Sequence, residues 1–248
     1  LPSKVSSAIL ALGQMNYKDN DLLRTKVIKI ICSYPHQDED HHTQASIIKS
    51  LLEVSKNQLS SYQEIEQKII SIIKSNSYEA SSIHVCITQL FYDHKVLPNE
   101  IKNLLLEMIP FIHHSSNNTI HYLDMVIPYL YEESETKIVE LLEKLFTQSD
   151  FQVGITQFPS LRSYLFNHSE KLSPLITRWF LSKSIQLNRF ATDLIDSNEI
   201  QLAFDIRQLS GETSTDYLLL ARKACGWCFM NPTVAISLIY SVYKTCSI

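Results

Sequence analysis

Glycine is the residue that this chain most lacks. Its 248 residues include four glycines, namely Gly13, Gly154, Gly211 and Gly226, whereas average usage is about 7%. Glycine supplies the positive φ angles of phosphate-binding loops, tight hairpin turns and β-bulges. The sequence contains no GxGxxG, GxxxxGK[ST] or GxSxG motif. These absences argue against nucleotide-binding α/β folds and serine hydrolases.

Long apolar runs and an excess of basic charge are also missing. The sequence has no 18-residue apolar segment and no signal-peptide pattern, so we expect no membrane-spanning helix. The formal net charge of −4 argues against a nucleic-acid binder, because affinity for phosphate comes from clustered Lys and Arg. Residues 1–150 carry 13 basic and 19 acidic side chains. This acidic part favours a basic protein partner by electrostatic steering.

The five cysteines are odd in number and lie mostly in apolar segments. This usage fits reduced thiols better than a disulfide framework, so we expect a cytoplasmic location. The chain starts at Leu1 rather than at Met, which is typical of a fragment cut from a longer protein.

Apolar residues recur at helical spacing along almost the whole chain. The spacing predicts about fourteen helices, at residues 3–15, 20–33, 42–57, 62–75, 78–94, 99–114, 118–131, 135–148, 158–167, 170–183, 185–196, 199–209, 215–230 and 232–246. Short connections make consecutive helices antiparallel neighbours, and one hairpin per 35 residues or so is typical of helical-repeat solenoids. Pro110 and Pro128 fall inside helical patterns and are expected to kink or end them. We predict an all-α solenoid of about seven hairpins, a single domain over 1–248 with a seam near 150–158.

Residues 8–31, "AILALGQMNYKDNDLLRTKVIKII", resemble a HEAT-type repeat. A first helix ends in Leu12 and Gly13, an acidic turn follows, and an arginine lies near the start of the second helix. In that family a turn Asp and a helix Arg bond between adjacent repeats and form a ladder. The resemblance therefore implies structural ladder roles for Asp21 and Arg24. Residues 119–146 look like a second, degenerate unit without a matching Arg.

Cys225 and Cys228 have the CxxC spacing of a dithiol redox centre or of half a zinc site. On a helix over 215–230 they would continue an apolar stripe near its C-terminal end, where the helix dipole opposes thiolate formation. A zinc site would need two more ligands, and Cys246 is the one obvious neighbour. We therefore interpret the motif as core packing, and we expect no cofactor and no resident metal.

Two histidine-rich turns also contain metal-capable side chains. The segment 35–42, "PHQDEDHH", groups three histidines with three carboxylates ahead of a predicted helix, which favours a solvated turn and helix cap. His113, His114 and His121 bracket a polar turn, and Asp124 lies three residues beyond His121. Because this spacing matches no standard zinc pattern, we interpret the second segment as a solvated turn.

The C-terminal part contains five of the six arginines. Arg178 lies beside Trp179, and an exposed Arg–Trp pair is the kind of anchor that dominates protein interfaces. We predict partner contacts at Arg178, Trp179 and Arg189, with a core position as the alternative for the tryptophan.

The architecture predicts a non-enzymatic scaffold or sensing module that binds a protein partner on its curved surface. Some HEAT-like proteins are DNA glycosylases that use an Asp and aromatic residues in a basic groove. Arg178, Trp179 and Asp193 form the one cluster that could be assigned to that role, although the net charge argues against it. A toxin-neutralising immunity protein with an acidic helical surface is a third alternative.

Overall fold

The structure of the chain is a computed structural model. It describes residues 4–17, 20–35, 40–56, 61–75, 79–148, 153–195, 202–205, 214–226 and 231–246. All regular elements within these ranges are helices, which confirms the predicted all-α class.

The chain divides into two compact units, Leu1–Leu145 and Phe146–Ile248. The helices that begin in the first unit are α1 (Lys4–Gln14), α2 (Asp21–Ser33), α3 (His41–Ser55), α4 (Tyr62–Ser75), α5 (Ala80–Asp93), α6 (Asn99–Leu106), the 3-10 turn η1 (Ile109–Phe111) and α7 (Asn117–Phe146). The second unit contains η2 (Ile155–Gln157), α8 (Pro159–Asn167), α9 (Ser169–Leu181), α10 (Ile185–Ile195), α11 (Ser214–Gly226) and α12 (Pro232–Cys246). The division lies close to the segment 150–158, and the single-domain assignment stays a prediction.

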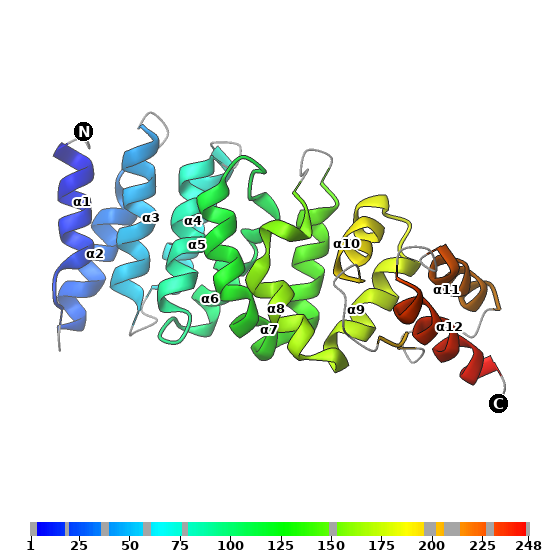
Figure 1. Ribbon diagram of the computed structural model, residues 1–248. Coiled ribbons are helices and arrows are strands. Elements are labelled where there is room, and N and C mark those ends of the chain that lie inside the picture. Colours follow the sequence, from blue (N-terminus) through cyan, green and yellow to red (C-terminus); the bar gives the residue numbers. More distant parts are fainter. Residues whose placement is uncertain are drawn as a thin grey trace. The chain divides into compact units, whose positions relative to one another are not determined.

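In the first unit, the first helices of successive hairpins pack side by side, in the order α1, α3, α5 and the first part of α7 (Figure 1). Ser6 Oγ lies 2.6 Å from Ser46 Oγ, and Ser50 Oγ donates a hydrogen bond of 2.9 Å to the Ile9 carbonyl. Because a small residue lies at each of these contacts, α1 and α3 approach closely. Gly13 belongs to the same contact between α1 and α3, and no side chain fits there, since a β-carbon would lie 2.6 Å from the Ser50 Cα.

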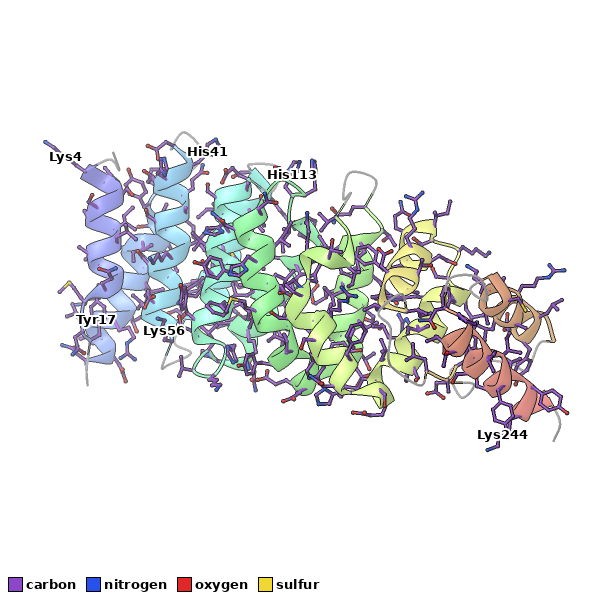
Figure 2. The ribbon with its side chains drawn as sticks, in the orientation of Figure 1. Lys4, Tyr17, His41, Lys56, His113 and Lys244 are labelled. Atoms are coloured by element: carbon purple, nitrogen blue, oxygen red, sulfur yellow. The ribbon has the colours of Figure 1, made fainter. Side chains whose placement is uncertain are left out.

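The same layer continues through polar contacts between α3, α5 and α7. Lys56, just after the C-terminal end of α3 (Figure 2), lies 2.9 Å from the Asp93 carboxylate at the end of α5. His84 Nδ1 of α5 lies 2.9 Å from Thr119 Oγ1 of α7. In each contact the N-terminal part of one helix meets the N-terminal part of the next, or the C-terminal parts meet. The helices of this layer are therefore parallel.

The second helices of the hairpins, α2, α4, α6 and the end of α7, form the other layer of the first unit. Hydrogen bonds join neighbours in this layer, from Lys68 Nζ to the Tyr34 carbonyl, from Tyr62 OH to the Glu100 carbonyl (3.4 Å) and from Lys102 Nζ to Glu133 (2.8 Å). In both layers, the hydrogen bonds that join one hairpin to the next connect residues that are 31 to 41 positions apart in the sequence. This recurring separation is compatible with a helical repeat.

Helix α7 supplies both helices of the fourth hairpin. Ser134 has non-helical dihedral angles (φ −157°, ψ 70°), so the helix breaks between the parts predicted as 118–131 and 135–148. The break lies at Ser134 rather than at Pro128, which α7 accommodates within its helix. The sequence-based expectation that Pro128 would end or kink its helix placed the interruption too early.

Two other predicted helices differ from the structure. The helix expected over 99–114 ends at Leu106, and Pro110 lies in η1, because proline lacks the N–H that a continuing helix would need. Within the helix expected over 199–209, the described residues 202–205 are not helical. Their backbone instead bonds to two helices of the second unit: Asp205 N donates to Thr177 Oγ1 (2.8 Å) and Phe204 N donates to Ser241 Oγ (3.0 Å).

Aromatic side chains fill the core of the second unit. Trp179 is fully buried, and its ring centroid lies 6.1 Å from the centroids of both Phe146 and Phe190. Phe146 in turn stacks on Phe190 at 4.1 Å and meets Phe158 edge-on at 5.3 Å. Trp179 therefore occupies the core position that the sequence left as its alternative, and its indole is not a surface contact in this conformation.

We expect Gly13→Ala to destabilise the protein by about 1–3 kcal/mol, because the new methyl group would collide with the backbone of α3. Gly226→Ala is the control, since a β-carbon there meets nothing within 4 Å. Urea unfolding monitored by circular dichroism measures both. Wild-type stability in Gly13→Ala would show that α1 and α3 do not approach this closely.

Trp179→Ala should lower the free energy of unfolding by about 3–5 kcal/mol, the usual loss for a buried aromatic side chain. Tyr240→Ala is the matched surface change, because that ring is 61% exposed, and it should shift stability by no more than about 0.5 kcal/mol. Thermal and urea unfolding distinguish the two. A Trp179→Ala protein as stable as the Tyr240→Ala protein would contradict the core assignment.

Candidate partner-binding surface

Exposed aromatic and methionine side chains gather where α5 and α7 lie side by side. Tyr92 of α5 is 67% exposed, and Tyr129 and Met125 of α7 are 51% and 38% exposed. Tyr122, Met125 and Tyr129 have i, i+3 and i+7 spacing, which places them on one stripe of the helix. We call these four side chains, Tyr92, Tyr122, Met125 and Tyr129, the aromatic patch. Tyr and Met are enriched at protein interfaces relative to the rest of the surface.

Neighbouring rings hold the patch in place. The Tyr122 ring centroid lies 5.3 Å from that of Phe91, 5.8 Å from that of His84 and 5.9 Å from that of Tyr92. Hydrogen bonding to Tyr122 raises the pKa of Tyr92, which keeps the phenol in its neutral form. Rings that are already ordered lose little conformational freedom when a partner binds.

Tyr129 is held from two directions. The buried His94 ring stacks on it with centroids 5.2 Å apart, and Lys95 Nζ lies 5.7 Å from the Tyr129 centroid. The second distance is within the range of a cation–π contact. The Tyr129 ring therefore has a fixed orientation although half of its surface is accessible.

A charged network joins α5 to α3 next to the patch. Lys56 Nζ lies 2.7 Å from Glu53 and 2.9 Å from Asp93, and the Gln89 side-chain amide donates to the same two carboxylates. Burial opposes the charge of Lys56, but hydrogen bonds to Glu53 and Asp93 raise its pKa. The network fixes α5 against α3, and its two carboxylates and one ammonium leave one net negative charge beside the aromatic patch.

The residues predicted to contact a partner do not form one surface. Arg178 on α9 and Arg189 on α10 are exposed, whereas Trp179 between them in sequence is fully buried. Its burial also removes the exposed aromatic ring that a base-binding groove built from Arg178, Trp179 and Asp193 would need. Partner contacts by the two arginines stay a prediction.

The two residues assigned to a ladder contact each other inside α2. Arg24 Nη1 lies 3.4 Å from Asp21 Oδ1, and Arg24 Nη2 donates to the Tyr17 carbonyl at 3.4 Å. In a HEAT ladder the Asp and Arg of adjacent repeats bond to each other, whereas this contact lies within one helix. The ladder role of Asp21 and Arg24 therefore stays a prediction. Lys68, Tyr62 and Lys102 already bridge neighbouring second helices.

The CxxC motif lies partly outside the described residues. Leu220 and Ala224 of the predicted stripe are buried, but Cys225 is exposed, so the packing interpretation is wrong for that thiol. Cys228 lies outside the described residues, as does the side chain of Cys246. Among the side chains that the structure describes, no three His, Cys, Asp or Glu residues are grouped so that they could hold a metal ion.

The histidine-rich turns serve local structure. Asp40 caps α3 by accepting a 2.7 Å hydrogen bond from Thr43 N, as the cap interpretation predicted, while His36, Asp38 and Glu39 lie outside the described residues. His113 Nδ1 contacts Ser115 Oγ at 2.7 Å.

In the second histidine-rich segment, His121 is exposed and Asp124 is 1% exposed, although both lie on α7. The aromatic patch begins beside His121. The helical spacing of the patch residues on α7 is present in the sequence. That spacing could not identify the patch, because buried and exposed faces of a helix have the same spacing.

No described helix has the length and apolar character that would let it cross a membrane. Comparisons with protein-family models, with curated proteins and with solved structures find no match for this chain. The resemblance of residues 8–31 to a HEAT repeat stays a prediction.

The thiols should differ in reactivity toward iodoacetamide. Burial raises the pKa of Cys86 to about 12, and burial together with the Glu64 carboxylate raises the pKa of Cys32 to about 11. At about pH 8 both are almost entirely in the unreactive thiol form. Mass spectrometry should find Cys225 alkylated well before Cys32 and Cys86. Labelling in denaturant is the control, and alkylation of Cys86 as fast as that of Cys225 in the native protein would contradict the burial.

Proposed function

We propose that this protein is a non-enzymatic protein-interaction module, a HEAT-like α-solenoid whose aromatic patch on α5 and α7 binds a protein partner. The observation that carries the proposal is the exposure of Tyr92, Met125 and Tyr129 on two adjacent, parallel helices. Large exposed side chains of these types anchor protein interfaces because they bury much apolar area when a partner covers them.

The stacked architecture supports the same function. Polar contacts with a recurring separation of 31 to 41 residues fix each hairpin against the next. A stack of this kind presents outward residues of several helices as one extended surface.

Charge favours a basic partner. Residues 99–107 and 132–146 contain seven glutamates and three lysines, an excess of four negative charges on α6, on the residue after it, and on α7 from Glu132 onward. Two of the lysines are paired, Lys102 with Glu133 at 2.8 Å and Lys137 with Glu107 at 3.2 Å. The remaining negative field would steer a positively charged protein toward the first unit.

The experiment is affinity capture with three versions of the chain. The patch variant carries Tyr92→Ser and Tyr129→Ser, and the matched control carries Tyr240→Ser and Tyr243→Ser on α12. The control removes two rings of similar exposure, 61% and 66%, from the second unit. A true partner should be captured by the wild type and by the control, and the patch variant should bind it at least tenfold more weakly.

A basic partner adds a second expectation, a steep fall of its association rate with rising salt. Equal capture by the patch variant and the control would contradict the assignment of the patch. Salt-independent association would contradict the charge of the partner. Circular dichroism of all three proteins verifies that the substitutions leave the fold intact.

A further inference from the structure

A groove separates α4 from α6 in the second layer of the first unit, away from the aromatic patch. Its cavity has a volume of about 360 Å³, within the range of ligand-binding pockets. Five apolar side chains line it: Ile70, Ile73, Leu104, Met108 and Phe111. The last of these is 37% exposed, whereas Ile73 and Met108 are buried.

The groove exists because α6 is short. Helix α6 ends at Leu106, and Pro110 directs the chain into η1, while α4 continues to Ser75. The C-terminal half of α4 therefore faces Met108 and Phe111 rather than another turn of α6. Near the first residues of both helices, the Tyr62 phenol oxygen lies 3.4 Å from the Glu100 carbonyl oxygen, so α4 and α6 are in contact there.

The two ends of the groove carry opposite charges. At one end Glu66 accepts a 3.1 Å hydrogen bond from Tyr62 OH. Burial, together with this hydrogen bond, raises the pKa of Tyr62 to about 12, so the phenol remains a neutral donor and leaves the Glu66 charge uncompensated. At the other end Lys74 is exposed and has no ion-pair partner among the described residues.

The other two charged side chains that line the groove, Lys137 and Glu107, pair with each other. Lys137 Nζ lies 3.2 Å from Glu107 Oε1 and donates to Asn103 Oδ1 at 3.0 Å. Glu66 and Lys74 are thus the two charges that an occupant can neutralise. They are eight residues apart on α4, about 12 Å along the helix axis, which an extended chain spans in about four residues.

We infer that this groove binds an extended segment of a partner protein with a basic residue, an apolar residue and an acidic residue at alternate positions. The basic side chain pairs with Glu66, the apolar side chain rests on Ile73, Met108 and Phe111, and the acidic side chain pairs with Lys74. The spacing of the two charges sets the four-residue separation, and the apolar floor between them selects the central residue. This site does not depend on the aromatic patch.

Three capped pentapeptides test the inference: Arg-Ala-Leu-Ala-Glu, Arg-Ala-Leu-Ala-Arg and Glu-Ala-Leu-Ala-Glu. The readout is three of the four methionine methyl resonances, those of Met15, Met108 and Met125, in protein labelled with ¹³C-methyl methionine. Met108 lies in the groove, Met125 lies in the aromatic patch and Met15 is an exposed residue elsewhere. The first peptide should shift the Met108 resonance, leave the other two unchanged, and bind about tenfold more tightly than either same-charge peptide.

Charge-reversal variants provide the decisive control. Lys74→Glu makes both ends of the groove acidic and should switch the preference to the peptide with two arginines, whereas Glu66→Lys should switch it to the peptide with two glutamates. Replacing the central leucine by serine in the first peptide should abolish binding. Thermal unfolding verifies that both variants fold.

The inference is overturned if Met108 does not respond, if the three peptides bind equally, or if the variants keep the wild-type preference. A shift of Met125 in place of Met108 also overturns it, because the peptide would then occupy the patch. Loss of partner capture by the patch variant would leave the groove result unchanged, so the two proposals fail independently.

Discussion

Each amphipathic hairpin of the first unit depends on its neighbour, because one hairpin alone cannot cover its apolar stripe. The stripes of α3, α4 and α5 are almost completely buried, with Ile47, Ile69 and Ile87 at 0% exposure. This burial supplies the main favourable free energy of such a stack. It does not by itself determine register, since apolar contacts are non-directional. Register comes from the polar contacts between hairpins.

Those contacts differ between the two layers, and the difference determines what each layer presents to solvent. In the first layer the seam of Gly13, Ser46 and Ser50 lets α1 and α3 approach closely, whereas the larger side chains of α5 and α7 leave aromatic rings at the surface. In the second layer, long side chains such as Lys68 and Lys137 bridge the helices. The groove of this layer lies between α4 and α6, because α6 ends at Leu106 while α4 continues to Ser75.

In the second unit, large aromatic side chains form the core between the helices. Phe146, Phe158, Trp179 and Phe190 fill its core, and the segment 202–205 is fastened by hydroxyl groups of α9 and α12. In the sequence, Trp179 beside Arg178 has the pattern of an exposed interface anchor. Here the helix turns the two side chains in different directions, because adjacent positions on a helix lie about 100° apart.

The sequence by itself determined the all-α class and most helix positions, because helical periodicity and capping residues act locally. Its helix bounds also separated the two parts of α7 near Ser134, although the kink or end expected at Pro128 was wrong. It also predicted a helix cap within residues 35–42, and the structure shows that Asp40 provides it. Tertiary structure decided which stripes face solvent, since Tyr122, Met125 and Tyr129 have the same spacing as a core stripe. It decided that Trp179 is buried and Cys225 exposed, and that α6 stops early enough to leave a groove beside α4. Each of these features depends on which helix packs against the residue, and the local sequence pattern does not specify that helix.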